Sequence, residues 1–222
     1  MFHYDKGIKI NGAALWLDAE RRVEFCCVSH AHLDHARKHD LVIATEQTVT
    51  FLKQRLGKSK TVTLRYEEPY EFDGCKITLF PAGHILGSAQ TLVETNGARL
   101  LYSGDFNMDD NVAAEPIKIP QSDVLIMECT FGKPQYRFPP RKQTEKKLVE
   151  FVSETLKQHA VPVVIGYVLG KSQEAMKILG EAGFEMSVHG SIARLAETYE
   201  RYGIQLGRWH RYHKDEIAGK VL

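Results

Sequence analysis

The sequence lacks several features that would assign it to a common class of protein. Its four cysteines, at positions 26, 27, 75 and 129, form neither C-x-x-C pairs nor the dense pattern of a small secreted domain. Three of them fall in apolar runs, where buried free thiols are expected. No charge is in excess, since 29 Lys and Arg oppose 28 Asp and Glu and leave a net charge of +1. Binding to a polyanion would therefore depend on a local patch.

Long hydrophobic runs are also missing. No apolar stretch approaches the ~18 residues of a membrane span, and the first ten residues lack the basic start and apolar stretch of a signal peptide. We therefore expect a cytoplasmic protein without membrane contacts. The 222 residues, 43% hydrophobic and 26% charged, are typical of a soluble globular chain of about one and a half domains.

Short strands separated by turns fill the first 130 residues, with little helix, which indicates a sheet-rich layered architecture. Asn96-Gly97 predicts a hairpin between two of these strands. The last strand is an unbroken apolar run that we expect to be buried on both faces. The expected strands cover residues 13–17, 23–29, 60–66, 75–82, 88–95, 98–105 and 123–129.

Beyond residue 140 the pattern changes to alternating helices and strands, which predicts parallel α/β units and a second domain. Prolines and basic residues at 132–143 interrupt the pattern and mark the boundary. We therefore divide the chain into domains 1–135 and 136–222. Helices are expected at 144–158, 171–183 and 191–203, a buried strand at 161–168 and a further strand at 184–190.

Four candidate metal ligands lie within six residues, in the run H-A-H-L-D-H that follows the strand at 23–29. Alternation places His30 and His32 on one side of an extended segment, and the turn that follows brings Asp34 and His35 toward the same space. Imidazoles with a carboxylate suit zinc or a related divalent ion. The alternative is a polar surface loop. Burying so many polar groups without a metal would leave several of them unsatisfied.

Two more residues that follow strands support the same centre. His84 lies in P-A-G-H-I-L-G-S, and Asp105 lies in S-G-D-F. Strand ends are the usual way in which a rigid sheet presents a site. Taken singly, His84 would be a satisfied histidine and Asp105 a turn residue. Together with the histidine cluster they are interpreted as metal ligands.

These motifs resemble those of the metallo-β-lactamase superfamily. The resemblance implies a four-layered αβ/βα sandwich and two metal ions, which we expect to be zinc. Asp18, in L-W-L-D, looks like the family's first motif, an aspartate that supports the metal-binding loop. By the same resemblance the ligands of the first metal are His30, His32 and His84, those of the second are Asp34 and His35, and Asp105 bridges the two.

A narrower resemblance follows in the sequence. I-M-E-C-T-F-G, which contains Glu128, is similar to the E-x-T-Y-G motif of the β-CASP branch, the nucleases of RNA 3′-end processing, RNA decay and DNA repair. Residues 166–174 resemble that branch's A-x-G-R-A-Q-E segment, and the chain looks closest to the ligase-associated DNA exonucleases. The implied fold is an incomplete metallo-β-lactamase sandwich followed by part of an α/β β-CASP domain. The implied catalytic residues are Asp34, Glu128 and Asp18, around a hydroxide held by both zinc ions.

Basic residues provide candidate contacts to nucleic acid. The 166–172 segment lacks the four residues between glycines that a nucleotide-binding P-loop requires, but a helix N-terminus with Lys171 would suit a backbone phosphate. Arg137, Arg141 and Lys142 lie among aromatic residues, a pattern that suits a nucleic-acid strand. An ordinary solvated linker is the alternative interpretation.

The later β-CASP motifs have no match in this sequence. The second metal is therefore expected to lack a protein ligand and to bind more weakly than the first. We expect a fragment, a natural truncation, or half of a split enzyme completed by self-association or a second polypeptide. The predicted function is a metal-dependent nuclease acting on DNA or RNA, weakened by the missing motifs. The alternatives are a small-molecule (thio)ester or lactam hydrolase of the same superfamily and a non-catalytic remnant that binds nucleic acid or a partner.

Overall fold

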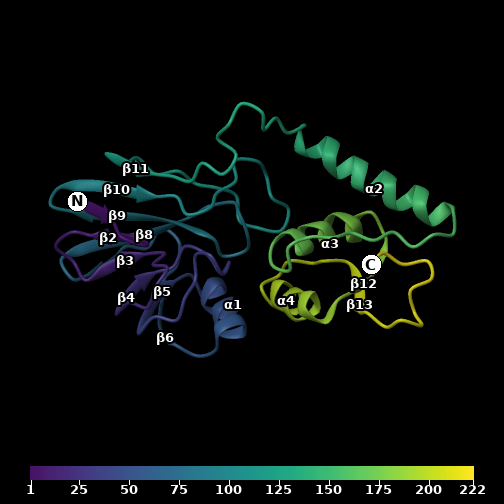
Figure 1. Ribbon diagram of the computed structural model, residues 1–222, viewed down its shortest axis with the longest axis horizontal. Helices are drawn as coiled ribbons and strands as arrows, with labels where there is room; N and C mark the ends of the chain where they lie inside the picture. Colours follow the sequence, from purple (N-terminus) through teal and green to yellow (C-terminus); the bar gives the residue numbers. More distant parts are fainter. The chain divides into compact units, whose positions relative to one another are not determined.

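The computed structural model describes residues 1–222, and the chain forms two compact units, Met1–Cys129 and Thr130–Leu222 (Figure 1). The first unit contains two mixed sheets and one helix. The second contains three helices and a two-stranded parallel sheet. None of the helices combines the length and apolar composition that a membrane span requires.

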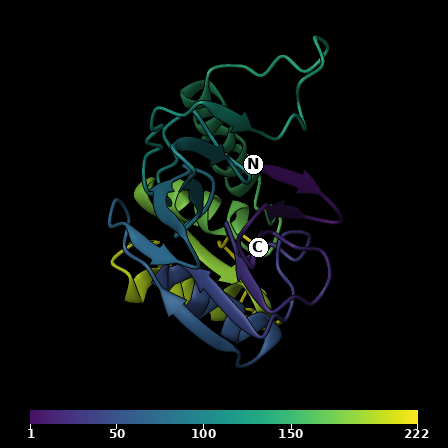
Figure 2. The ribbon, with the colours of Figure 1, turned by 90° about the vertical axis from the view of Figure 1, so that its left-hand side faces the viewer.

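The first sheet of the N-terminal unit has six strands in sequence order. The hairpin of β1 and β2 lies at its edge (Figure 2), and β2 and β3 are also antiparallel, whereas β3 to β6 run parallel. Parallel strands bring their carboxyl ends to one edge, so the loops after β3 and β4 start side by side. The strands are β1 (Phe2–Tyr4), β2 (Ile8–Ile10), β3 (Leu15–Leu17), β4 (Phe25–Cys27), β5 (Leu41–Ala44) and β6 (Lys60–Thr63).

The second sheet has the order β11-β10-β9-β8-β7, and only β10 and β11 are parallel. The predicted hairpin at Asn96-Gly97 is confirmed between β9 and β10. Both turn residues have positive φ, 52° and 75°, as a tight two-residue turn requires. The strands are β7 (Tyr70–Phe72), β8 (Cys75–Pro81), β9 (Ala89–Thr95), β10 (Ala98–Tyr102) and β11 (Val124–Ile126).

The core of this unit lies between the two sheets. Leu15 and Ile43 of the first sheet and Ile77 and Leu100 of the second belong to one buried cluster and are fully inaccessible to solvent. Helix α1 (Glu46–Leu56) packs against β5 and β6 and buries its own set of side chains, Phe51 among them. The sandwich is therefore built from alternating residues whose inward side chains fill the space between the layers.

The C-terminal unit consists of α2 (Arg141–Lys157), α3 (Lys171–Glu181), β12 (Glu185–Val188), α4 (Gly190–Arg201) and β13 (Arg208–Arg211). The three predicted helices are confirmed, as is the predicted strand at 184–190. Strands β12 and β13 pair in parallel, as alternating helices and strands predict. Helix α3 packs against α2, α4 and β12.

Two predictions of buried strands are wrong. The run at 123–129 forms only the short β11, which is the edge of its sheet and leaves Leu125 54% exposed. Residues 161–168 form no strand. The Val164 N–H donates to the Leu222 carbonyl at 2.7 Å, the Leu222 N–H donates to the Pro162 carbonyl at 2.9 Å, and Ile165 is 93% exposed. Burial of an apolar run depends on strands on both sides of it, which neither segment has.

Candidate metal centre

The site begins with a carboxylate that receives several hydrogen bonds at the end of β3. Asp18 Oδ1 accepts from the Ser29 N–H at 2.7 Å, and Oδ2 accepts from the Ser29 hydroxyl at 2.5 Å and the Tyr102 hydroxyl at 3.0 Å. Oδ2 also lies 2.8 Å from His35 Nδ1. Asp18 is buried and has a φ of 43°, a left-handed conformation that aspartate tolerates better than most residues. It therefore fixes both ends of the histidine loop.

Three imidazoles and one carboxylate meet at the rim of the two sheets. His32 Nδ1 lies 3.0 Å from His30 Nε2 and 3.2 Å from His84 Nε2. Asp105 Oδ2 lies 3.8 Å from His30 Nε2 and 3.6 Å from His84 Nε2. The four ligand atoms all lie within 4.8 Å of one another. Residues far apart in the sequence are thus brought together.

This donor set fits a divalent ion. Ligand nitrogens bound ~2.05 Å from a tetrahedral ion lie ~3.3 Å from each other, close to the two nitrogen separations around His32. Burial lowers the pKa of His30 well below its usual value, and the neighbouring His35 lowers it further. This imidazole is therefore neutral and able to bind a metal. This cluster of His and Asp side chains could therefore bind metal ions.

A second potential set contains Asp18, His30 and His35. His35 Nε2 lies 3.2 Å from Asp105 Oδ1, so its ring bridges the Asp18 and Asp105 carboxylates. Burial lowers the pKa of His35, but the hydrogen bonds to Asp105 and Asp18 outweigh it and raise the pKa to about 10. Asp34 lies at the margin: its side chain is 78% exposed, and Oδ2 is 3.8 Å from His35 Nε2.

Glu128 is not part of either ligand set. Its Oε1 accepts from the Phe106 N–H at 3.1 Å, and its own N–H donates to the Ser103 hydroxyl at 3.3 Å. Both contacts flank Asp105 in the sequence. Glu128 therefore holds the backbone that carries the Asp105 carboxylate.

The loop that carries His84 is held by residues that the sequence analysis did not identify. Ser88 Oγ accepts from the His84 N–H at 3.2 Å, and Asn111 Nδ2 donates to the His84 carbonyl at 2.8 Å. Glu115 Oε2 accepts from the Gly87 N–H at 2.9 Å, while the Thr45 hydroxyl donates to the Gly87 carbonyl at 2.6 Å. The only available sequence signal was Thr45, an N-cap residue before a helix.

The basic residues that were predicted to contact nucleic acid all lie in the C-terminal unit. Arg141 forms an ion pair with Glu174, and Lys171 Nζ lies 3.1 Å from the same carboxylate. Arg137 Nε donates weakly to the Pro134 carbonyl at 3.4 Å, and Lys142 is exposed. Two of the four cations are therefore already partnered by one glutamate.

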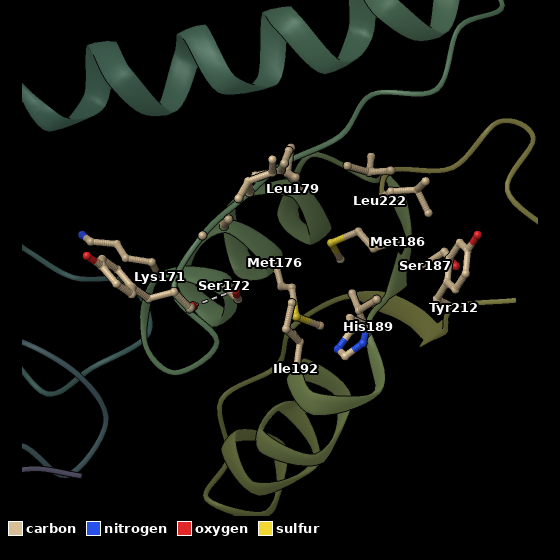
Figure 3. A pocket seen from close by; sticks show the side chains of 17 residues that line it. Lys171, Ser172, Met176, Leu179, Met186, Ser187, His189, Ile192, Tyr212 and Leu222 are labelled. Carbon is tan, nitrogen blue, oxygen red and sulfur yellow. Dashed lines mark hydrogen bonds between the residues drawn. The ribbon is translucent and has the colours of Figure 1, made fainter. Parts of the chain in front are cut away.

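A separate hollow of about 930 Å³ lies within the C-terminal unit (Figure 3). Figure 3 shows Met176, Met186 and Ile192 around it, with Lys171 and Tyr212 at opposite ends. Its lining is mainly apolar and includes none of the predicted metal ligands. It therefore lacks the donor set that the N-terminal unit provides.

No family model matches the chain, but several known proteins do. A probable DNA ligase of Opitutus terrae is 35% identical over 99% of this chain and 22% of its own length. An RNase J-like protein of Methanocaldococcus jannaschii is 30% identical over 72% of this chain and 44% of its own. Cleavage and polyadenylation specificity factor subunit 3 of Dictyostelium discoideum is 34% identical over 63% of this chain and 18% of its own. The chain thus spans less than half the length of these relatives.

A solved structure shares the fold. The crystal structure of a protein of unknown function from Enterococcus faecalis V583 superimposes with a TM-score of 0.60 over 86% of this chain and 51% of that one, at 17% identity. The sandwich predicted from the sequence is confirmed by this likeness and by the two mixed sheets. The chain is a relative of the metallo-β-lactamase and β-CASP proteins.

Proposed function

We propose that this protein is a metal-dependent nuclease that hydrolyses phosphodiester bonds of DNA or RNA, with zinc as its metal. The observation that carries the proposal is the convergence of His30, His32, His84 and Asp105 on one small volume. The names of the relatives support the substrate class, since an RNase J-like protein and a DNA ligase act on nucleic acid.

The candidate ligands and Asp18 would have different roles. His30, His32 and His84 would hold one ion, and Asp105 would lie between two. His35 with Asp34 would contribute to the second ion, which would displace the proton that His35 holds in its absence. Ions at these positions would polarise a phosphoryl oxygen and activate water for attack. Asp18 would act through His35, because its contact at Nδ1 turns Nε2 toward Asp105.

The Asp34 position supports a weaker second site. Its carboxylate is mostly exposed, whereas the His30 side chain is fully buried. We also interpret residues 1–135 as the part that holds the metals and 136–222 as part of a β-CASP-like domain, in which Arg137, Lys142, Arg141 and Lys171 would lie toward the nucleic acid.

The test measures metal content and cleavage on the same variants. We expect the purified protein to contain zinc and to shorten labelled single-stranded DNA or RNA. H30A and H32A should lose the tightly bound zinc and reduce cleavage at least ~100-fold, because each removes a ligand. H3A is the matched control: the His3 side chain is exposed, lies beside Asn11 and Trp16, and is outside the cluster.

Two outcomes would contradict the proposal. Unchanged zinc in H30A or H32A would show that the cluster does not hold the metal. Turnover of small esters or thioesters, with no cleavage of any polynucleotide, would instead establish a small-molecule hydrolase.

A further inference from the structure

Three aromatic side chains near the start of the C-terminal unit form an exposed cluster. The Phe131 ring lies edge to face against Tyr136, with centroids 5.4 Å apart, and against Phe138, with centroids 5.1 Å apart. The three residues are 59%, 44% and 68% exposed. Large apolar rings that gather at the surface are typical of a binding surface, whereas isolated exposed apolar residues are common.

The segment that carries this aromatic cluster is positively charged. Residues 130–144 include four basic residues and no acidic one. Arg141 is occupied by Glu174, but Lys133, Arg137 and Lys142 are exposed and form no ion pair with a carboxylate. Three unneutralised cations beside three rings are complementary to a polyanion that carries flat, stackable groups.

We propose that Phe131, Tyr136 and Phe138 stack against bases of a single-stranded nucleic acid, while Lys133, Arg137 and Lys142 contact its phosphates. The inference rests on the proposed function and narrows its substrate class. Bases in a duplex already stack on each other, so only an unpaired strand offers free faces to protein rings. Because the rings lie edge to face, with planes 77° and 85° apart, they present faces in different directions and suit bases that are splayed apart.

The binding test uses the full chain in the presence of a chelator, so that no cleavage occurs. Fluorescence anisotropy would compare a labelled single-stranded oligonucleotide, its duplex and an abasic strand of equal length. We expect F131L/F138L to weaken binding of the single strand by about tenfold to a hundredfold, with little change for the duplex or the abasic strand. F151L is the matched control, because Phe151 is an exposed ring on α2 outside the cluster.

The charge contribution is tested separately. K133Q/R137Q should reduce the slope of log affinity against log salt by about 1.4 for a single strand, which corresponds to two lost phosphate contacts. Hydrolysis of bis(4-nitrophenyl) phosphate, which has no base, should be unchanged in F131L/F138L and in F151L. This readout separates failure of the aromatic cluster from failure of the proposed function, which would abolish hydrolysis in the parent protein as well.

Three results would overturn the inference. Single-stranded binding by F131L/F138L as tight as that of the parent would exclude stacking on these rings. An equal loss on the abasic strand would show that the rings do not contact bases. A change in sedimentation from dimer to monomer, without a change in oligonucleotide binding, would identify the cluster as a self-association surface.

Discussion

At the scale of individual residues, the Asp18 carboxylate holds several residues of the candidate site in place. Both oxygens of Asp18 already accept hydrogen bonds, from Ser29 on one side and from Ser29, Tyr102 and His35 on the other. Direct binding of an ion would displace several of these bonds. These contacts favour the supporting role expected from the sequence, which stays a prediction.

Glu115 gives a prediction for stability against pH. Burial raises the pKa of its carboxyl above the usual value, although the Gly87 N–H bond opposes the shift. The folded state therefore binds this proton more tightly than the unfolded state, and stability falls as the pH rises from the unfolded toward the folded pKa. E115Q keeps an acceptor for Gly87 and removes the buried charge. We expect it to match the parent protein at about pH 4 and to be more stable at about pH 7.

Thermal unfolding at the two pH values measures this difference. E115A is the control, since it leaves the Gly87 N–H without its acceptor and should cost about 1–3 kcal/mol at both. A lower melting temperature for E115Q than for the parent at pH 7 would show that the charge itself stabilises the loop.

The candidate metal ligands stand out in the sequence because they are concentrated in short motifs after strands. Apart from Asp18, the residues that hold these side chains in place do not stand out in this way. Tyr102 is 84 positions from Asp18, and Asn111 is 27 from His84, so only folding brings each pair into contact. A hydroxyl or amide in such a place has no local pattern to distinguish it from an ordinary polar residue.

Helix α1 is the clearest difference at the scale of elements. The sequence analysis expected little helix in the first unit, and Thr48-Val49-Thr50 is a β-branched run of the kind that favours strands. The helix forms because Thr45 caps it, accepting from the Thr48 N–H at 3.2 Å, and because tertiary packing buries Phe51. Thr45 also holds the Gly87 carbonyl, so the start of the helix and the His84 loop are fixed together.

The other end of α1 yields a prediction about metal affinity. Arg55, in its last turn, donates to the carbonyl of Ala31 at 2.5 Å, between His30 and His32. R55A should release this backbone and weaken zinc binding about tenfold, as loss of a supporting contact around a metal site does. Competition with a fluorescent chelator would measure the affinity.

R65A is the matched control for this change. Arg65 is 86% exposed and pairs only with Glu68, so its loss should leave zinc affinity unchanged. Equal affinities of R55A and the parent protein would mean that the loop holds its shape without α1.

At the scale of the whole molecule, the predicted metal ligands and the predicted nucleic-acid contacts lie in different units. All six predicted metal ligands lie in Met1–Cys129, and the four predicted nucleic-acid contacts lie in Thr130–Leu222. The hydrophobic patterns identified most strands and helices on both sides of this division. They did not identify which strands are edges, because that depends on the order of strands in a sheet and not on the strand's own residues.

Limited proteolysis tests whether the chain consists of two independent units. Residues 131–140 are all exposed and lack regular helix or strand, so trypsin should cut first after Arg137, the Lys133 bond being protected by Pro134. The N-terminal product should keep its bound metal, measured by mass spectrometry under native conditions. R137Q should delay this cut selectively. A first cut within the sandwich, or loss of the metal on cleavage at Arg137, would show that the two units do not behave independently.

Burial protects three thiols of the sandwich from oxidants. Burial raises the pKa of Cys27 to about 12 and that of Cys75 to about 11, and Cys26 is also fully buried. The thiolate is the form that peroxide attacks, so these side chains stay reduced while the sandwich is folded. The candidate ligands are nitrogen and oxygen atoms only. A site of this composition would keep its metal under oxidative conditions that strip zinc from cysteine-bound centres.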